Sequence, residues 1–362
     1  MDGEPATLGS RVGAAVESLT PGYFALVMAT GILSTGLWLQ GHRAWSGAFL
    51  GATAVAWVVL TGLSLARLLR YRSAVADDFA DPRRAFGFFT LVAGTDVLAA
   101  RLGLDGRYAL MAVLLSVAGA LWLVLGYVVP WTAVLGRGTR PVVATANGTW
   151  FIWVVASQSV AVASAGLEPH AGAAQRDLAV LAVVSWSVGI FLYAAAGVLV
   201  ALRMMLYELR PEDLTPPYWV AMGACSITVL AGARIVGMAD TPMATAMRGL
   251  AGGTAIVFWG FASWLIPVLV AAGWWRHVRH GVPLRYEATW WSIVFPLGMY
   301  AVAGLYLGQA DHLPLVGAIG AAELWVALVV WAVVLLAMGR HLLRTVLLGE
   351  PRATAEPVGR GA

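Results

Sequence analysis

The chain has 362 residues, of which 60% are hydrophobic and only 12% are charged, and its mean hydropathy is +0.78. This composition excludes an ordinary soluble domain and indicates an integral membrane protein. Its 23 basic residues, histidine apart, are all arginine, so a Walker-type phosphate loop with its lysine is excluded. Cys225 is the only cysteine, which excludes an intrachain disulfide and a cysteine-rich metal cluster.

Apolar stretches long enough to cross a bilayer recur along the chain. At about 20 residues for each crossing, the sequence predicts spans at 23–39, 46–66, 86–103, 108–129, 149–166, 178–202, 217–238, 249–274, 289–308 and 316–338. The first 20 residues lack the features of a signal peptide, so we expect 1–20 to be retained as a cytoplasmic segment. We expect 21–347 to form one ten-helix transport domain and 348–362 to be a short cytoplasmic tail.

An aromatic pair opens every second span. The pairs are Tyr23-Phe24, Phe88-Phe89, Trp150-Phe151, Tyr218-Trp219 and Trp290-Trp291, and their first residues are 65, 62, 68 and 72 positions apart. Self-similarity at a nearly fixed period indicates a repeat architecture, and each unit is long enough for two spans. The predicted fold is therefore an all-α membrane protein with ten transmembrane helices, arranged as five helical hairpins in a quasi-fivefold ring around a central pore.

The arginines predict the orientation of the chain. Seventeen lie in segments on one side of the predicted spans and five on the other. The bias of basic residues toward the cytoplasm then places both termini inside a plasma (inner) membrane. The same arginines explain the basic pI as an orientation signal near anionic lipid, without a nucleic-acid partner.

Aligning the repeats on the first aromatic residue produces layers of small or aliphatic side chains. Close helix packing in lipid and a pore lining both favour such residues. These residues recur at one register in all five odd spans, which favours the pore lining. The longer even spans would then surround the odd spans and face lipid. The sixth positions are Met28, Ala93, Val155, Gly223 and Phe295; two positions later stand Thr30, Thr95, Ser157, Cys225 and Leu297. Together with Ser226, the hydroxyl residues Thr30, Thr95 and Ser157 are candidate pore-lining donors.

Phe295 interrupts the sixth-position layer with an aromatic ring. It precedes Pro296, which cannot donate a backbone hydrogen bond, and Gly298 loosens the same helix. Pro296 and Gly298 also belong to the predicted pore lining, together with the sixth-position residues Met28, Ala93, Val155 and Gly223. A ring on a kinked helix opposite small residues would occlude a narrow path. The alternative interpretation is an ordinary core phenylalanine.

Three segments carry a family resemblance. Leu19 to Gly31 (LTPGYFALVMATG), the Asn147-Gly148-Thr149-Trp150 opening of the fifth span, and Trp290 to Gly298 (WWSIVFPLG) resemble the tellurite-resistance/dicarboxylate transporter family. That family includes plant slow anion channels, sulfite efflux pumps and malate permeases. The resemblance implies five hairpins around an anion path, a phenylalanine plug at Phe295 and a homotrimer. It identifies a family better than a substrate.

Asp96 is a carboxylate inside a predicted span, where an ionised group is costly unless it is paired or functional. Three interpretations remain: it faces away from the axis and bonds a neighbouring helix, it carries a proton coupled to substrate movement, or it lines a cation route. Gln158 occupies the equivalent position of the fifth span.

Arg101 and Arg234 lie toward the outer ends of their spans. They could attract anions at the outer mouth. Alternatively, they snorkel to the interface with Asp105 or Asp240 as partners. The six histidines fall in loops or at span ends and present no facing pair, so we expect neither a metal nor another cofactor.

The leading functional prediction is movement of a small anion, such as chloride, nitrate, sulfite, a tellurite-related anion or a C4-dicarboxylate like malate. Sequence leaves open a channel gated by Phe295 or a proton-coupled carrier. An integral-membrane enzyme would need clustered carboxylates or histidines at a membrane face. A receptor or scaffold would leave the register of small residues unexplained.

Overall fold

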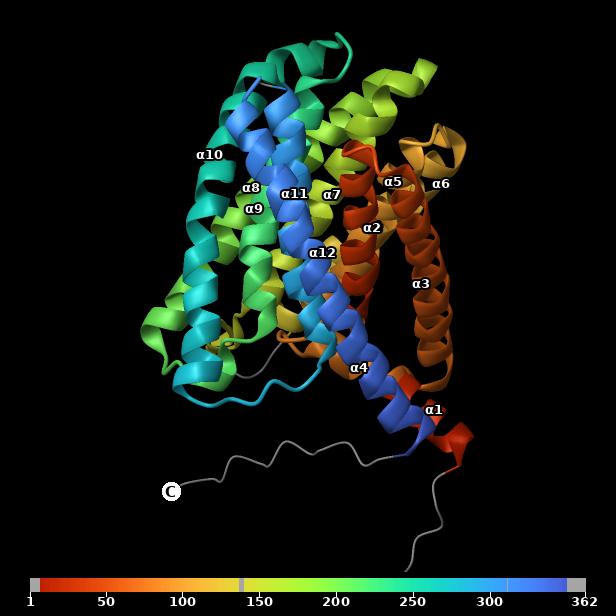
Figure 1. Cartoon of the computed structure of the whole chain (residues 1–362), viewed down its shortest axis with the longest axis vertical. Coiled ribbons are helices and arrows are strands. Elements are labelled where there is room, and N and C mark those ends of the chain that lie inside the picture. Colours follow the sequence, from red (N-terminus) through yellow and green to blue (C-terminus); the bar gives the residue numbers. More distant parts are fainter. Residues whose placement is uncertain (1–6, 137–139, 311, 350–362) are drawn as a thin grey trace, which may run out of the picture.

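The computed structural model describes residues 7–136, 140–310 and 312–349. Most of the predicted tail 348–362 and the first six residues therefore lie outside the described part. Within that part the chain is all-helical, and ten helices are long and apolar enough to cross a membrane (Figure 1). This confirms the predicted all-α class and the number of spans.

The odd-numbered spans are the inner helices, and they are short. Between 72% and 89% of their most apolar windows is buried, against 11% to 33% for the even-numbered spans. The odd spans thus pack inside the protein, while the even spans expose large apolar side chains, as lipid-facing helices do. The inner helices are α2 (Ala25–Leu39), α5 (Phe89–Gly103), α7 (Phe151–Leu167), α9 (Val220–Val236) and α11 (Trp291–Ala310).

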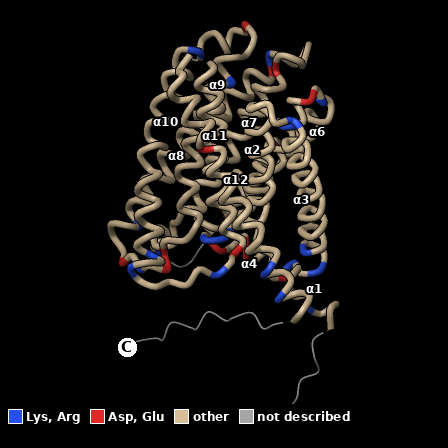
Figure 2. The backbone as a smooth tube through the Cα atoms, in the orientation of Figure 1, with Lys and Arg blue, Asp and Glu red and all other residues tan. Residues whose placement is uncertain are grey.

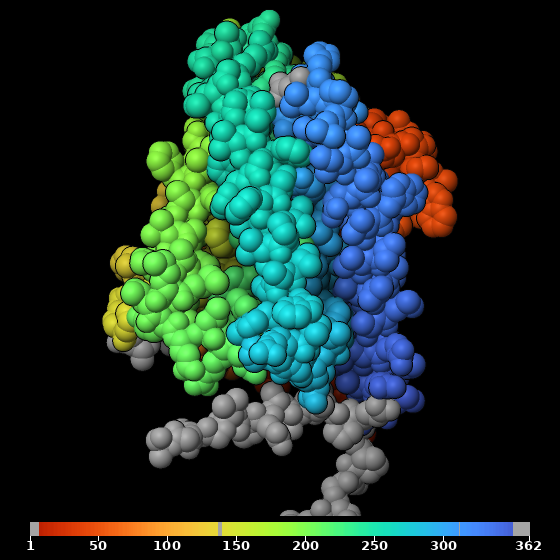
Figure 3. Space-filling model, turned by 60° about the vertical axis from the view of Figure 1, so that its left-hand side comes forward, coloured from red at the N-terminus to blue at the C-terminus, as the bar shows by residue number. Residues whose placement is uncertain are grey.

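Four of the five outer helices extend beyond the predicted apolar stretches because their ends continue into polar and arginine-containing sequence, whereas α6 has the predicted bounds. Figure 3 shows α8, α10 and α12 side by side over one face of the molecule. The outer helices are α3 (Arg43–Arg70), α6 (Tyr108–Val129), α8 (Gln175–Leu206), α10 (Pro242–Trp274) and α12 (Pro314–Leu342).

The inner helices contact one another in a closed order. α2 packs against α5, α5 against α7, α7 against α9, α9 against α11, and α11 against α2. Each outer helix packs both on the inner helix of its own repeat and on that of the following repeat, as α12 does on α11 and α2. The hairpins therefore overlap around the molecule rather than standing as separate pairs.

A 3₁₀ turn precedes each inner helix and carries the first aromatic residue of its pair. The turns are Pro21–Phe24, Ala85–Phe88, Gly148–Trp150, Pro216–Trp219 and Ala288–Trp290. They contact one another in the same cyclic order as the helices that they start. Glycine is required here: a Cβ on Gly87 would lie 3.0 Å from the Gly22 amide nitrogen, and one on Gly148 would collide with the Pro217 backbone.

Two helices that the sequence did not predict lie at the end of the molecule where α3 ends. They are α1 (Leu8–Glu17) and α4 (Arg72–Ala80), and neither has an apolar stretch of spanning length. Arg11 donates a hydrogen bond to the Leu347 carbonyl oxygen at 2.9 Å, so the two described ends of the chain lie together. Figure 2 shows charged residues gathered at the two ends of the helices, with long uncharged stretches between them.

A buried charge cluster holds α4 against α3. Arg67 donates to Asp78 at 2.7 Å, and both side chains are 6% exposed. Arg84 contacts the other Asp78 oxygen at 2.6 Å, and Arg67 also donates to the Glu17 carbonyl at the end of α1. The cluster thus ties α1, α3 and α4 together.

Replacing Asp78 by Asn should destabilise the protein by about 3 kcal/mol, because the buried Arg67 loses its counter-charge. Thermal unfolding in detergent measures the effect. The exposed neighbour Asp77→Asn is the control, and we expect it to change stability by less than about 0.5 kcal/mol. Equal effects of the two variants would contradict the importance of the cluster.

Candidate functional site

A small cavity lies between the inner helices. Its volume is about 20 Å³, enough for about one water molecule. All five inner helices, which contact one another in a closed order, contribute to its wall. Its lining residues are Ile32, Thr35, Asp96, Val97, Ala100, Ser159, Val162, Ile227, Leu230, Arg234, Met299 and Tyr306.

The lining follows the internal repeat. One residue from each inner helix stands nine positions after the first aromatic residue of its repeat, and these five form one level of the cavity. Three positions further, four of the five helices contribute again, as expected for one face of a helix. The first level consists of Ile32, Val97, Ser159, Ile227 and Met299, and the second of Thr35, Ala100, Val162 and Leu230.

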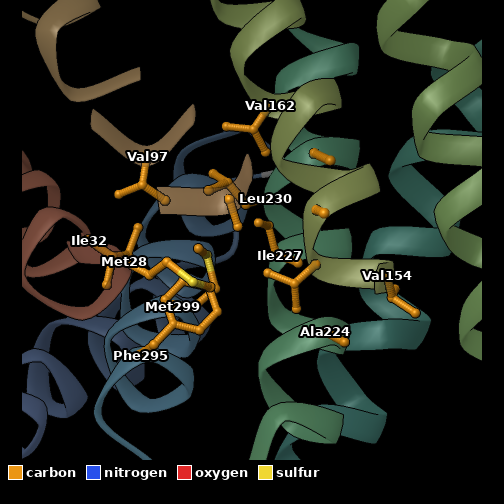
Figure 4. Packing of buried hydrophobic residues seen from close by; sticks show 14 of the residues in the cluster. Met28, Ile32, Val97, Val154, Val162, Ala224, Ile227, Leu230, Phe295 and Met299 are labelled. Atoms are coloured by element: carbon orange, nitrogen blue, oxygen red, sulfur yellow. The ribbon is translucent and has the colours of Figure 1, made fainter. Parts of the chain in front are cut away.

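The sixth-position layer lies one helical turn from the first cavity level, on the side where the inner helices begin. On each inner helix the residue of this layer stands four positions before the residue of the first cavity level. The two residues therefore lie on the same helix face, about 6 Å apart along the helix. Figure 4 shows the ring of Phe295 packed beside Met28 and Met299. The layer is fully packed: Met28 is 2% exposed, Phe295 1%, and Ala93 and Val155 are completely buried. Gly223, its fifth member, lies close to the ring of Pro296.

The hydroxyls predicted to line a path are engaged elsewhere. Trp331 of α12 donates its indole N–H to Thr30 at 3.1 Å, Trp57 of α3 donates to Thr95 at 2.9 Å, and Trp122 of α6 donates to Ser157 at 2.9 Å. None of the three hydroxyl residues contributes to the cavity wall. Their position two residues beyond the sixth turns them toward the outer helices, and this corrects the expectation that they are donors in the path.

The remaining residues of the predicted lining make packing contacts. The Ser226 hydroxyl donates to the Met222 carbonyl within its own helix at 2.9 Å. A Cβ on Gly223 would lie 2.9 Å from Pro296, and one on Gly298 would lie 2.8 Å from Ile32. These glycines let α11 approach α9 and α2 closely, which is the function of small residues at helix contacts in lipid.

Asp96 lines the cavity and is 1% exposed. Its Oδ2 atom accepts a hydrogen bond from Ser159 of α7 at 2.8 Å, whereas Oδ1 is buried without a hydrogen-bond partner among the described residues. The interpretation in which this carboxyl faces away from the axis is therefore wrong, although it does bond a neighbouring helix. Gln158, at the equivalent position of its repeat, instead donates to the Trp186 carbonyl of α8 at 3.2 Å.

Arg234 also lines the cavity, from a position two helical turns beyond Ile227. It donates to the Tyr306 hydroxyl at 2.6 Å, and its guanidinium lies 4.3 Å from the centre of the Tyr306 ring. Its Nε atom is buried without a hydrogen-bond partner among the described residues. The expected pairing with Asp240 is wrong, because Asp240 pairs with Arg248 at 2.6 Å.

Arg101 does not line the cavity. Its guanidinium is buried between helices, where it donates to Ser34 at 2.9 Å and to Ser46 at 2.8 Å and pairs with Asp105 at 3.0 Å. The expected Asp105 partner is confirmed, but the side chain is 3% exposed and joins α2, α3 and α5 instead of attracting anions at a mouth.

Sequence reasoning missed Ser159 and Tyr306. Ser159 lies four residues after the sixth position of its repeat, and Tyr306 lies eleven residues after that of its own repeat. Steps of four and eleven residues stay on one helix face, so counting helical turns from the sixth position would have found both. Within the described residues, no three histidine, cysteine, aspartate or glutamate side chains are grouped so that they could hold a metal ion. The chemistry that this cavity offers is one cationic group, one carboxyl and a few hydroxyls in an apolar wall.

Ten spans and a cavity between the inner helices that carries charged groups are features of a multi-pass membrane protein of the channel or transporter type. The family model described as SLAC1, voltage-dependent anion channel, matches residues 18–339. The chain belongs to this family, as the resemblance predicted, and the family points to anion transport across a membrane rather than to an enzyme.

Its relatives bear general names. An uncharacterized membrane protein of Mycobacterium tuberculosis is 63% identical over 156 residues, which cover 43% of this chain and 79% of the relative. An uncharacterized transporter of Methanocaldococcus jannaschii is 24% identical over 193 residues, covering 52% of this chain and 54% of the relative.

Removing the Thr95 and Ser157 hydroxyls together (Thr95→Val, Ser157→Ala) should lower stability, because two indole N–H groups lose their acceptors. We expect a loss of about 1–3 kcal/mol for each, with the anion ranking unchanged. Thermal unfolding and reversal potentials measure the two properties. Ser226→Ala, which removes only a hydrogen bond within one helix, is the control. If the double variant changes the anion ranking and keeps normal stability, the Thr95 and Ser157 hydroxyls line the path after all.

Proposed function

We propose that the protein moves small anions along the axis of the inner helices and that the closed circuit of these helices is a quasi-fivefold ring. The observation that supports this is the cavity walled by all five inner helices, directly beyond the layer that contains Phe295. A binding or scaffold function would not require an axial cavity with residues from every repeat.

Phe295 is the gate in this proposal. It is the one aromatic ring in a layer whose other members are Met28, Ala93, Val155 and Gly223. The ring is buried, so no wet path crosses the layer while it is in place. Apolar constrictions of this kind close channels by excluding water.

The charge pattern favours weak anion selectivity. Arg234 is the only basic residue on the cavity wall among the described residues, and it stands at the end away from Phe295. The remaining wall is mostly apolar, so coordination is weak and an ion leaves as readily as it enters. The substrate class is a small anion such as chloride, nitrate, sulfite or a tellurite-related anion, with discrimination that follows the cost of dehydration.

The arginine distribution and the family resemblance support the cellular setting. We place both termini in the cytoplasm and the protein in the plasma membrane, because the arginine-rich segments lie on the side of the termini. The apolar outer surface faces lipid, and assembly as a homotrimer would cover part of it. The partners are then lipid, further copies of the chain and the transported anion.

Replacing Phe295 by Ala should raise anion flux several-fold, because it removes the only ring that blocks the sixth-position layer. Flux into liposomes that contain the pure protein, with reversal potentials in a chloride gradient, provides the measurement. Phe49→Ala is the matched control, since Phe49 is a buried ring on the outer helix α3. If a folded Phe295→Ala protein conducts no more than the parent, Phe295 is a packing residue and the gate is elsewhere.

A second candidate function is a proton-coupled carrier of C4-dicarboxylates of the malate type. Asp96 supports it, because this carboxyl lines the cavity with Arg234 and keeps one oxygen without a protein partner. A carboxyl that gains and loses a proton there would change the charge of the cavity by one unit in each cycle.

If Asp96 carries the coupled proton, Asp96→Asn should abolish the pH dependence of uptake while the protein still assembles, because the amide keeps the shape but does not titrate. Uptake is measured in liposomes with and without a pH gradient. Glu323→Gln is the control, because this carboxyl lies on the outer helix α12. Unchanged pH dependence in folded Asp96→Asn protein would exclude the carrier mechanism through this residue.

A further inference from the structure

Each outer helix carries an aromatic hydrogen-bond donor near its middle. The five residues are Trp57, Trp122, Tyr193, Trp259 and Trp331, one on each of α3, α6, α8, α10 and α12. Each of these helices packs against the inner helix of the following repeat. The donors therefore stand where they can join neighbouring repeats around the whole molecule.

Four of the five donors reach a side chain at one register. The acceptors lie seven positions after the first aromatic residue of their repeats. Three indoles donate to Thr30, Thr95 and Ser157 at 2.9 to 3.1 Å. Tyr193 of α8 lies beside Cys225, which stands at the same register of the fourth repeat. The three indole bonds fix α2, α5 and α7 to the outer helices at the same level.

The fifth contact, on α11, lacks its hydrogen bond. The equivalent residue there is Leu297, which has no acceptor. Trp259 still lies against α11, because its ring stacks on Tyr300, three residues from Leu297 and so on the same helix face. Its Nε1 atom is nevertheless buried without a hydrogen-bond partner among the described residues.

The missing hydrogen bond lies beside a proline that interrupts the main-chain hydrogen bonding of α11. Pro296, next to Leu297, has no N–H and leaves one main-chain hydrogen bond of the helix unmade. Beyond this point α11 is held to both neighbouring outer helices. Tyr300 bonds Ser263 of α10 at 2.6 Å, and Gly304 packs so closely on α12 that an added Cβ would lie 3.1 Å from the Val316 carbonyl oxygen. At this level the half of α11 that carries Phe295 therefore lacks the hydrogen bond from an outer helix that α2, α5 and α7 have.

We propose that the unmade Trp259–Leu297 contact lets the Trp291–Leu297 half of α11 swing about Pro296, and that this movement displaces Phe295. Trp259 and Leu297 then set how readily the path opens. The proposal rests on the proposed gate at Phe295. It assigns the opening movement to one helix, whereas α2, α5 and α7 stay fixed by their indole hydrogen bonds.

A hydroxyl at position 297 tests the proposal by supplying the missing acceptor. Leu297→Thr should lower anion flux into liposomes about fivefold relative to Leu297→Val, the factor that corresponds to one net hydrogen bond. Valine has the shape of threonine without the hydroxyl, so it controls for the lost volume. Adding Trp259→Phe to Leu297→Thr should return the flux to the Leu297→Val level.

The Phe295→Ala background separates this proposal from the gate itself. With the ring removed, Leu297→Thr and Leu297→Val should conduct equally. If Phe295→Ala raises flux but the two position-297 variants never differ in the parent background, the proposal is overturned and the gate stands. If Phe295→Ala fails to raise flux, the gate is wrong and the proposal is overturned with it.

A second measurement does not depend on how well the position-297 variants fold. Trp122→Phe should lower the midpoint of thermal unfolding, because it breaks the bond to Ser157. Trp259→Phe should lower it much less, because it breaks no hydrogen bond. Equal losses in the two variants would show that Trp259 is as strongly bonded as its counterparts and would overturn the proposal.

Discussion

The hydrogen bonds from outer aromatic residues to inner helices are the interaction on which the rest of this structure depends. In a bilayer the hydrophobic effect does not drive helices together, because lipid tails are as apolar as leucine. Specific polar bonds and close backbone contacts must therefore decide which helices are neighbours. The bonds from Trp57, Trp122 and Trp331 each cross from one repeat to the next, so they join four of the five hairpins.

The same polar bonds leave an apolar face of each inner helix free for the axis. Once Thr95 and Ser157 turn outward, the residues on the axial face are those one helical turn apart, such as Val155 and Ser159. The residues of the cavity wall and of the sixth-position layer are therefore those on the helix faces that the outward-facing hydroxyls leave free. Charged groups enter the cavity only from Asp96 and Arg234 among the described residues, and each keeps one polar atom without a protein partner.

The helix α11 differs from its counterparts in several linked ways. It has a proline in its middle, an aromatic ring in the sixth-position layer and a leucine where the other repeats offer Thr, Ser or Cys. Each departure alone would be unremarkable in a repeat protein. Their concentration within Phe295-Pro296-Leu297 places the proline interruption and the missing hydrogen-bond acceptor beside the ring proposed as the gate.

The sequence by itself determined the class of protein, the ten spans, the division into inner and outer helices and the family, because apolar length and repeat period are local properties of the chain. It also identified the layer of Met28, Ala93, Val155, Gly223 and Phe295. Only the tertiary structure decided which neighbouring positions face the axis, since a shift of two residues rotates a side chain by about half a turn. It likewise decided the partners of Arg101 and Arg234 and the donors of the outer helices, because these contacts join segments from different repeats. Spacing along the chain does not encode such contacts.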